Sequence, residues 1–96
     1  MAVYLLVPLE TITAKIDQSV SEKILPSDRF ELQNQRGWLI NYSGTSVELS
    51  NFLNITFQTE AGNASVGSAL IVSVSFYYGR GNKTMWEWLE VKLADK

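Results

Sequence analysis

The stretch Ala69-Leu70-Ile71-Val72-Ser73-Val74-Ser75-Phe76-Tyr77-Tyr78 is the strongest strand signal in the chain and decides its fold class. β-Branched and aromatic residues dominate it, and successive residues of a strand point to opposite faces. One face carries Leu70, Val72, Val74 and Phe76, and the other carries Ile71, Ser73, Ser75 and Tyr77. The pattern predicts a strand over residues 69–78 whose serine-bearing face packs closely on a helix or is partly hydrated.

Two further elements are expected at the start of the chain. Residues 3–7 form a short apolar run ended by Pro8, which is typical of a buried strand. Apolar residues then recur every four positions between Thr11 and Pro26, and this spacing predicts a helix with one buried stripe. The stripe consists of Ile12, Ile16, Val20 and Ile24.

The middle of the chain predicts a hairpin and a short helix. Phe30 and Leu32 alternate with polar residues, and the turn-like residues 34–37 lead into a second β-like run at 38–42. Thr45 and Glu48 have the spacing of a capping box, which marks the start of a helix ending near Asn54. Its predicted buried face is Leu49, Phe52 and Leu53, and residues 57–67 are expected to form the one long loop.

A last helix is expected after the strand at 69–78. Residues 79–83 break the strand, and Thr84 and Glu87 repeat the capping-box spacing, so we predict a C-terminal helix over 84–94. Its apolar face has helical spacing, while Trp88 points elsewhere. The residues of that face are Met85, Trp86, Leu89 and Leu93.

The order of these elements predicts one α+β domain covering residues 1–96. Strand, helix, strand, strand, helix, strand is the order of a ferredoxin-like βαββαβ sandwich. Short connections and right-handed crossovers favour a four-stranded antiparallel sheet with two helices on one face, to which the C-terminal helix is added.

Composition excludes several kinds of site. The chain has 96 residues, no Cys and no His, so disulfides, thiol nucleophiles, Cys/His zinc sites and imidazole bases are ruled out. The net charge of -2 does not favour nucleic-acid binding, which usually needs clustered Lys and Arg, although local binding stays possible. No cofactor, metal ion or catalytic residue is predicted.

Residues 1–7 are apolar without a basic leader, and Pro8 interrupts them, so they predict a strand instead of a signal peptide. No apolar run approaches the length of a membrane span. We therefore expect a cytoplasmic protein without membrane contact.

Three phrases resemble small ferredoxin-like proteins related to the CRISPR-associated adaptation endonucleases. They are residues 2–6 (AVYLL), 37–40 (GWLI) and 44–49 (GTSVEL), and the resemblance covers residues 1–78. It implies metal-dependent phosphodiester cleavage by a homodimer, with an Asp just after the first strand. This chain has Pro8-Leu9-Glu10 there, so only Glu10 could take that place.

The segment Gly79-Arg80-Gly81-Asn82-Lys83 is the first candidate site. Its glycines allow close backbone approach, Arg80 and Lys83 are cationic, and a helix N-terminus follows, which together suit a phosphate or carboxylate. Tyr78 beside the segment offers a stacking surface. The alternative is a plain connector between strand and helix.

The tryptophans of the last helix are the second candidate. Trp86 and Trp88 lie about 200° apart around a helix, so both cannot face one core. We expect Trp86 in the core and Trp88 either in a partner interface or flat against the domain's own sheet edge or long loop.

Three functions follow from these features. The preferred one is a non-catalytic interaction module that self-associates, as a homodimer, through its sheet or its Trp-bearing helix, and binds another macromolecule such as a protein partner. The first alternative is a divergent metal-dependent nuclease in which Glu10 binds a divalent ion across a dimer interface. Among the scattered acids, the nearest grouping is Glu10 with Asp28, if the first two strands end near each other. The second is a binder of small anions or nucleotides through residues 79–83.

Overall fold

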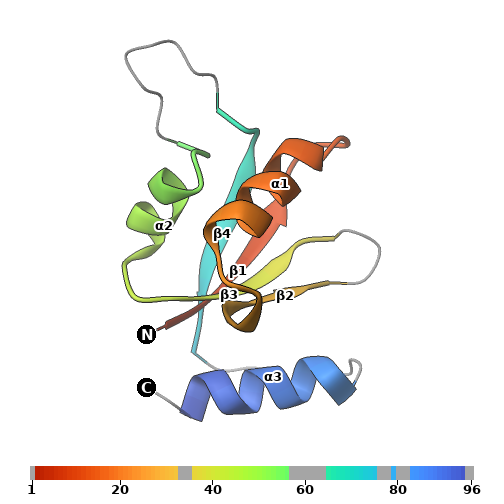
Figure 1. Ribbon diagram of the computed structural model, residues 1–96, viewed down its shortest axis with the longest axis vertical. Helices are drawn as coiled ribbons and strands as arrows, with labels where there is room; N and C mark the ends of the chain where they lie inside the picture. The colour runs from red at the N-terminus through yellow and green to blue at the C-terminus, as the bar shows by residue number, and fades with distance from the viewer. Residues whose placement is uncertain (1, 33–35, 57–64, 76–78, 80–82, 95–96) are drawn as a thin grey trace.

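The computed structural model describes residues 2–32, 36–56, 65–75, 79 and 83–94, and these form an α+β fold (Figure 1). The strands are β1 (Ala2–Pro8), β2 (Arg29–Glu31), β3 (Trp38–Tyr42) and β4 (Ala69–Val74). The helices are α1 (Ala14–Lys23), α2 (Ser46–Phe52) and α3 (Lys83–Ala94), with a 3₁₀ turn η1 (Pro26–Asp28) before β2.

The four strands form one antiparallel sheet in the order β2-β3-β1-β4. Leu5 of β1 lies opposite Leu39 of β3 on one side and Val72 of β4 on the other. β1 and β3, the most buried strands, occupy the centre, while β2 and β4 lie at the edges. The predicted α+β class, the antiparallel four-stranded sheet and the hairpin are confirmed.

Hydrophobic side chains pack on both faces of the sheet. Tyr4 and Leu6 of β1 contact the cluster that contains Ile16 of α1 and Leu49 of α2. The alternate residue Val3 points to the opposite face, where it packs with Leu39 and with Leu89 of α3. The sheet thus lies between α1 and α2 on one face and α3 on the other.

Specific polar contacts fix the helices on their face. The hydroxyl of Ser19, on the buried side of α1, donates to the carbonyl of Leu53 at 2.7 Å and links α1 to the end of α2. The indole Nε1 of Trp38 donates to the Asp17 carboxylate at 2.9 Å. Each contact gives a buried or half-buried polar group its partner, which removes the cost of burying it alone.

The capping box predicted at the start of α2 is confirmed. The Glu48 amide donates to Thr45 Oγ1 at 3.1 Å, and the Thr45 amide donates to Glu48 Oε1 at 3.0 Å. The hydrogen bond from the Thr45 backbone, and then that with its side chain, lower the pKa of the Glu48 carboxyl below its ordinary value. The box sets the position at which the chain leaves β3 and turns into α2.

Two residues expected in the core are exposed. Helix α1 begins at Ala14, so Ile12 lies before the helix and is 81% exposed. Phe52 is 43% exposed because it lies at the outer end of α2, where its ring stacks on Tyr42 and beneath the Lys23 ammonium. Helical spacing alone does not show where a helix begins or how far its end projects beyond the sheet.

Two predicted boundaries also differ. β4 ends at Val74, with Ser75 already outside the strand, and residues 76–78 of the predicted strand lie outside the described residues. Helix α3 begins at Lys83, so Thr84 is already helical and the second capping box does not form. Glu87 instead forms an ion pair with Lys83 across one helical turn, at 3.7 Å.

Candidate interaction surface

The outer edge of β4 is an open strand edge without charged residues. Within the described residues β4 pairs with β1 alone, so its other side presents backbone groups without a neighbouring strand. Natural proteins usually guard such edges with charged residues, proline or bulges. β4 has the sequence Ala-Leu-Ile-Val-Ser-Val and contains none of these residues.

The register identifies the backbone groups that point outward. The Leu9 amide donates to the Ser68 carbonyl at 2.9 Å, which continues the β1–β4 ladder and marks this position as a hydrogen-bonded pair. Hydrogen-bonded and non-hydrogen-bonded pairs alternate along an antiparallel ladder. Leu70, Val72 and Val74 therefore bond to β1. Ala69, Ile71 and Ser73 direct their N–H and C=O groups away from the sheet.

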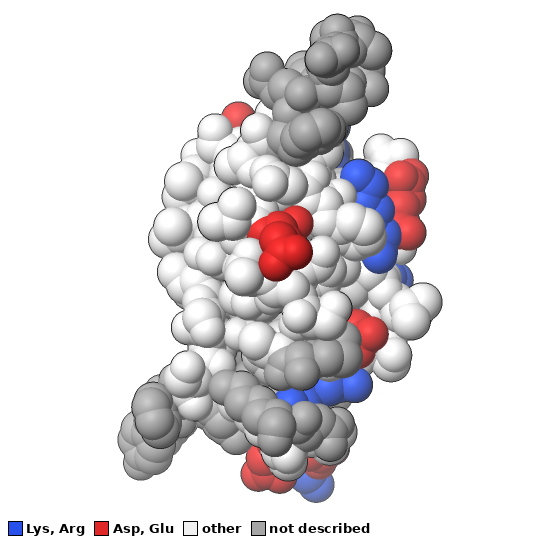
Figure 2. Space-filling view, turned by 90° about the vertical axis from the view of Figure 1, so that its left-hand side faces the viewer, with Lys and Arg blue, Asp and Glu red and all other residues white. Residues whose placement is uncertain are grey.

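Apolar side chains lie on the face of β4 that also carries α3. Leu70 and Val72 are 51% and 38% exposed, and they extend beyond the part of the sheet that α3 covers. The side of the molecule shown in Figure 2, which is the left-hand side of Figure 1, is largely uncharged, with acidic and basic side chains at its right-hand margin and lower end and acidic spots at its centre and near its top. An exposed apolar area beside an open strand edge suits association with another chain.

A groove follows the other face of β4. It separates α2 from the strand and has a volume of about 350 Å³. Its walls include Val47 and Ser50 of α2 and Ala69 and Ile71 of β4. An extended segment pairing with β4 would place alternate side chains in this groove.

Helix α3 covers the opposite end of the same sheet face. Leu89 is buried against Val3 and Leu39, and Trp86 and Trp88 pack around it, each half-buried. The Trp88 ring lies 6.3 Å from that of Phe30 on β2. Trp88 thus rests against the protein's own sheet, which was one of the two positions expected for it. A role of Trp86 and Trp88 in an interface stays a prediction.

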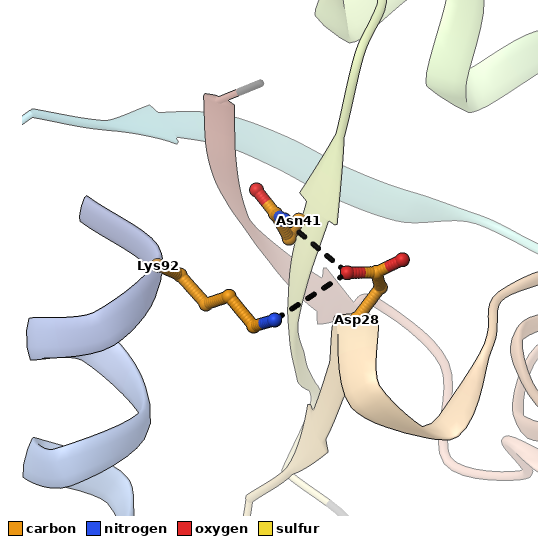
Figure 3. A network of polar contacts seen from close by, with 3 residues as sticks. All are labelled: Asp28, Asn41 and Lys92. Carbon is orange, nitrogen blue, oxygen red and sulfur yellow. Dashed lines mark hydrogen bonds and ion pairs between the residues drawn. The ribbon is translucent and has the colours of Figure 1, made fainter. Parts of the chain in front are cut away.

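A polar contact holds the C-terminal part of α3 (Figure 3). The Asp28 carboxylate in η1 accepts a hydrogen bond from Asn41 Nδ2 at 3.2 Å and lies 3.6 Å from the Lys92 ammonium. Both charged side chains are largely shielded, with 23% and 18% exposure. Asp28 therefore joins α3 to the central strand β3.

The cationic segment at 79–83 is only partly described. Tyr78, Arg80, Gly81 and Asn82 lie outside the described residues. Lys83 is 90% exposed and forms its ion pair with Glu87. Anion binding by this segment stays a prediction.

The proposed pairing of Glu10 with Asp28 is wrong. β1 and β2 run in the same direction, because each is antiparallel to β3. Asp28 bonds to Asn41, which lies opposite Val3 at the start of β1, whereas Glu10 follows the end of that strand. Seven residues of extended chain separate the two ends by about 23 Å. No group of three or more acidic residues that could hold a metal ion occurs in the described part of the chain.

Comparison of the chain with protein-family models, curated proteins and solved structures found no match. Among the described helices, none is long and apolar enough to cross a membrane.

The sequence-based reasoning missed the edge of β4 as a site. It predicted a strand over residues 69–78 without giving that strand a place in the sheet, because an apolar β-run suits a central strand as well as an edge. The sequence did contain one indication: the last described strand of the chain has no charged residue and no proline. The strand order then shows that this strand lies at the edge of the sheet, where the lack of charge and proline leaves it open to pairing.

Proposed function

We propose that this protein is a non-catalytic interaction module that self-associates, as a homodimer, and presents the assembled surface to another macromolecule. The observation that carries the proposal is the outer edge of β4, which is uncharged, unpaired within the described residues and flanked by exposed Leu70 and Val72. An edge of this kind is a template for pairing with another strand.

The proposal includes a ferredoxin-like topology. The order β2-β3-β1-β4, with every neighbour antiparallel and α1 and α2 on one face, supports it. In such a sheet β4 is an edge strand, and α3 would then be an addition to the face that the two crossover helices leave open. A cytoplasmic location belongs to the same proposal, and the absence of Cys agrees with a protein that needs no oxidising compartment.

Sedimentation equilibrium of the purified chain over a range of concentrations tests self-association. We expect a dimer that dissociates on dilution. A mass equal to that of the monomer at every concentration would remove the proposal.

A substitution at Ser73 tests whether the edge is responsible. Its N–H points outward, so Ser73→Pro removes no bond to β1 but places a proline ring on the outer edge. We expect Ser73→Pro to be monomeric and Ser73→Ala to remain dimeric, with both variants keeping the wild-type circular dichroism. If Ser73→Pro fails to fold, Val72→Lys gives the same test through like-charge repulsion across the edge.

A further inference from the structure

We infer that two copies of the chain pair through antiparallel β4 strands with Ile71 facing Ile71 of the second copy. This inference rests on the proposed self-association and names its partner and register. The result would be one continuous eight-stranded sheet with a twofold axis at Ile71.

The outward backbone groups limit the register. Hydrogen-bonded pairs between two copies can form only between Ala69, Ile71 and Ser73, because the intervening residues bond to β1. Pairing Ile71 with Ile71 matches Ala69 with Ser73 of the second copy at both ends. All three outward residues of each strand are then used. A shift by two residues toward the C-terminus would require Ser75, which lies outside the strand.

The side chains are compatible with the same register. Leu70 of one copy would lie opposite Val72 of the other, which joins two exposed apolar side chains on the α3-bearing face. On the other face, the Ile71 side chain of each copy would lie beside the groove between α2 and β4 of the other copy and lengthen its apolar wall. Apolar cross-strand pairs of this kind stabilise a sheet.

A second copy suits this edge because the strand is self-complementary. A twofold axis at Ile71 brings the residues beside the axis close to their own counterparts, so a charge there would lie near a like charge. β4 carries no charge, and the nearby Val47 of α2 is also apolar and 67% exposed. Nothing along the strand therefore opposes pairing with itself.

Cysteine cross-linking tests the register directly, since the natural chain contains no Cys. Residues 70 and 72 of opposite copies would form a non-hydrogen-bonded pair with Cα atoms about 4.5 Å apart. That separation lies within the range that a disulfide spans. Two copies of residue 72 would instead be diagonal neighbours about 7–8 Å apart, which is too far for a disulfide.

The experiment mixes Leu70→Cys and Val72→Cys, refolds the pair together, and oxidises it with oxidised glutathione. Intact mass under non-reducing conditions distinguishes the mixed disulfide from the two symmetric ones, because the Leu70→Cys and Val72→Cys chains differ in mass. We expect the mixed disulfide from the mixture and none from either variant alone.

Other outcomes separate this inference from the proposed function. A symmetric Val72→Cys disulfide would overturn the register, because Val72 would then face itself. A dimeric wild type with no cross-link in any sample would place the interface away from β4 and leave self-association standing. A monomeric wild type would overturn both.

Discussion

Replacing Leu89 by alanine tests whether α3 is an integral part of the folded domain. Leu89 is 4% exposed and packs on Val3 and Leu39, which are 0% and 5% exposed. Buried Leu→Ala changes cost about 2–5 kcal/mol, from lost transfer free energy and from the cavity that remains. The cavity would lie beneath a single surface helix that can move inward, so we expect the free energy of unfolding to fall by about 2–3 kcal/mol.

Urea denaturation, followed by tryptophan fluorescence and by far-ultraviolet circular dichroism, measures this loss. Val91→Ala is the matched control, because Val91 belongs to the same helix and is 58% exposed. Its effect should stay within about 0.5 kcal/mol. We expect Leu89→Ala to lower the midpoint with little change in slope, since the whole domain still unfolds together. Equal midpoints for the two variants would refute the packing of α3 on the sheet.

Four further perturbations address local contacts. Thr45→Ala removes the cap of α2 and should cost about 1 kcal/mol in urea denaturation. Because the folded-state pKa of Glu48 is lowered, the stabilisation by its carboxylate is present above the unfolded pKa and is lost as pH falls through the folded pKa. The cost of Glu48→Gln should therefore shrink in acid, and a cost unchanged in acid would contradict this. Gly37→Ala should cost more than about 1 kcal/mol in thermal unfolding, because Gly37 has φ of +138° and no room for a Cβ; an unchanged melting temperature would contradict this. Lys92→Met keeps the apolar stem but removes the ion pair with Asp28, and should cost at most about 1 kcal/mol, decreasing in high salt; a loss that salt leaves unchanged would argue against an electrostatic origin.

Much of the core could be predicted from spacing. Ile16, Val20 and Ile24 recur at the helical period, and all three are buried. The capping box of α2 could be predicted because both of its partners lie within four residues of each other. These features depend on neighbours in the chain, so local sequence contains the information that they need.

The position of Trp88 could not be decided in this way. Helical geometry separates it from Trp86, yet both pack around Leu89. A helix that lies flat on a sheet contacts it over a wide arc, and long aromatic side chains reach the surface from either flank. The presence of Phe30 beneath Trp88 depends on where β2 lies in the sheet.

The sequence by itself determined the α+β class, the approximate position of each helix and strand, and the absence of Cys and His chemistry. Tertiary structure decided that β4 is an edge strand, that Glu10 and Asp28 lie at opposite ends of the sheet, and that α3 covers only part of the open face. The physical reason is the range of the interactions. Periodicity and capping act over a few residues, whereas strand order follows from pairing residues far apart in the chain. The proposed interaction surface therefore becomes visible only in the folded molecule.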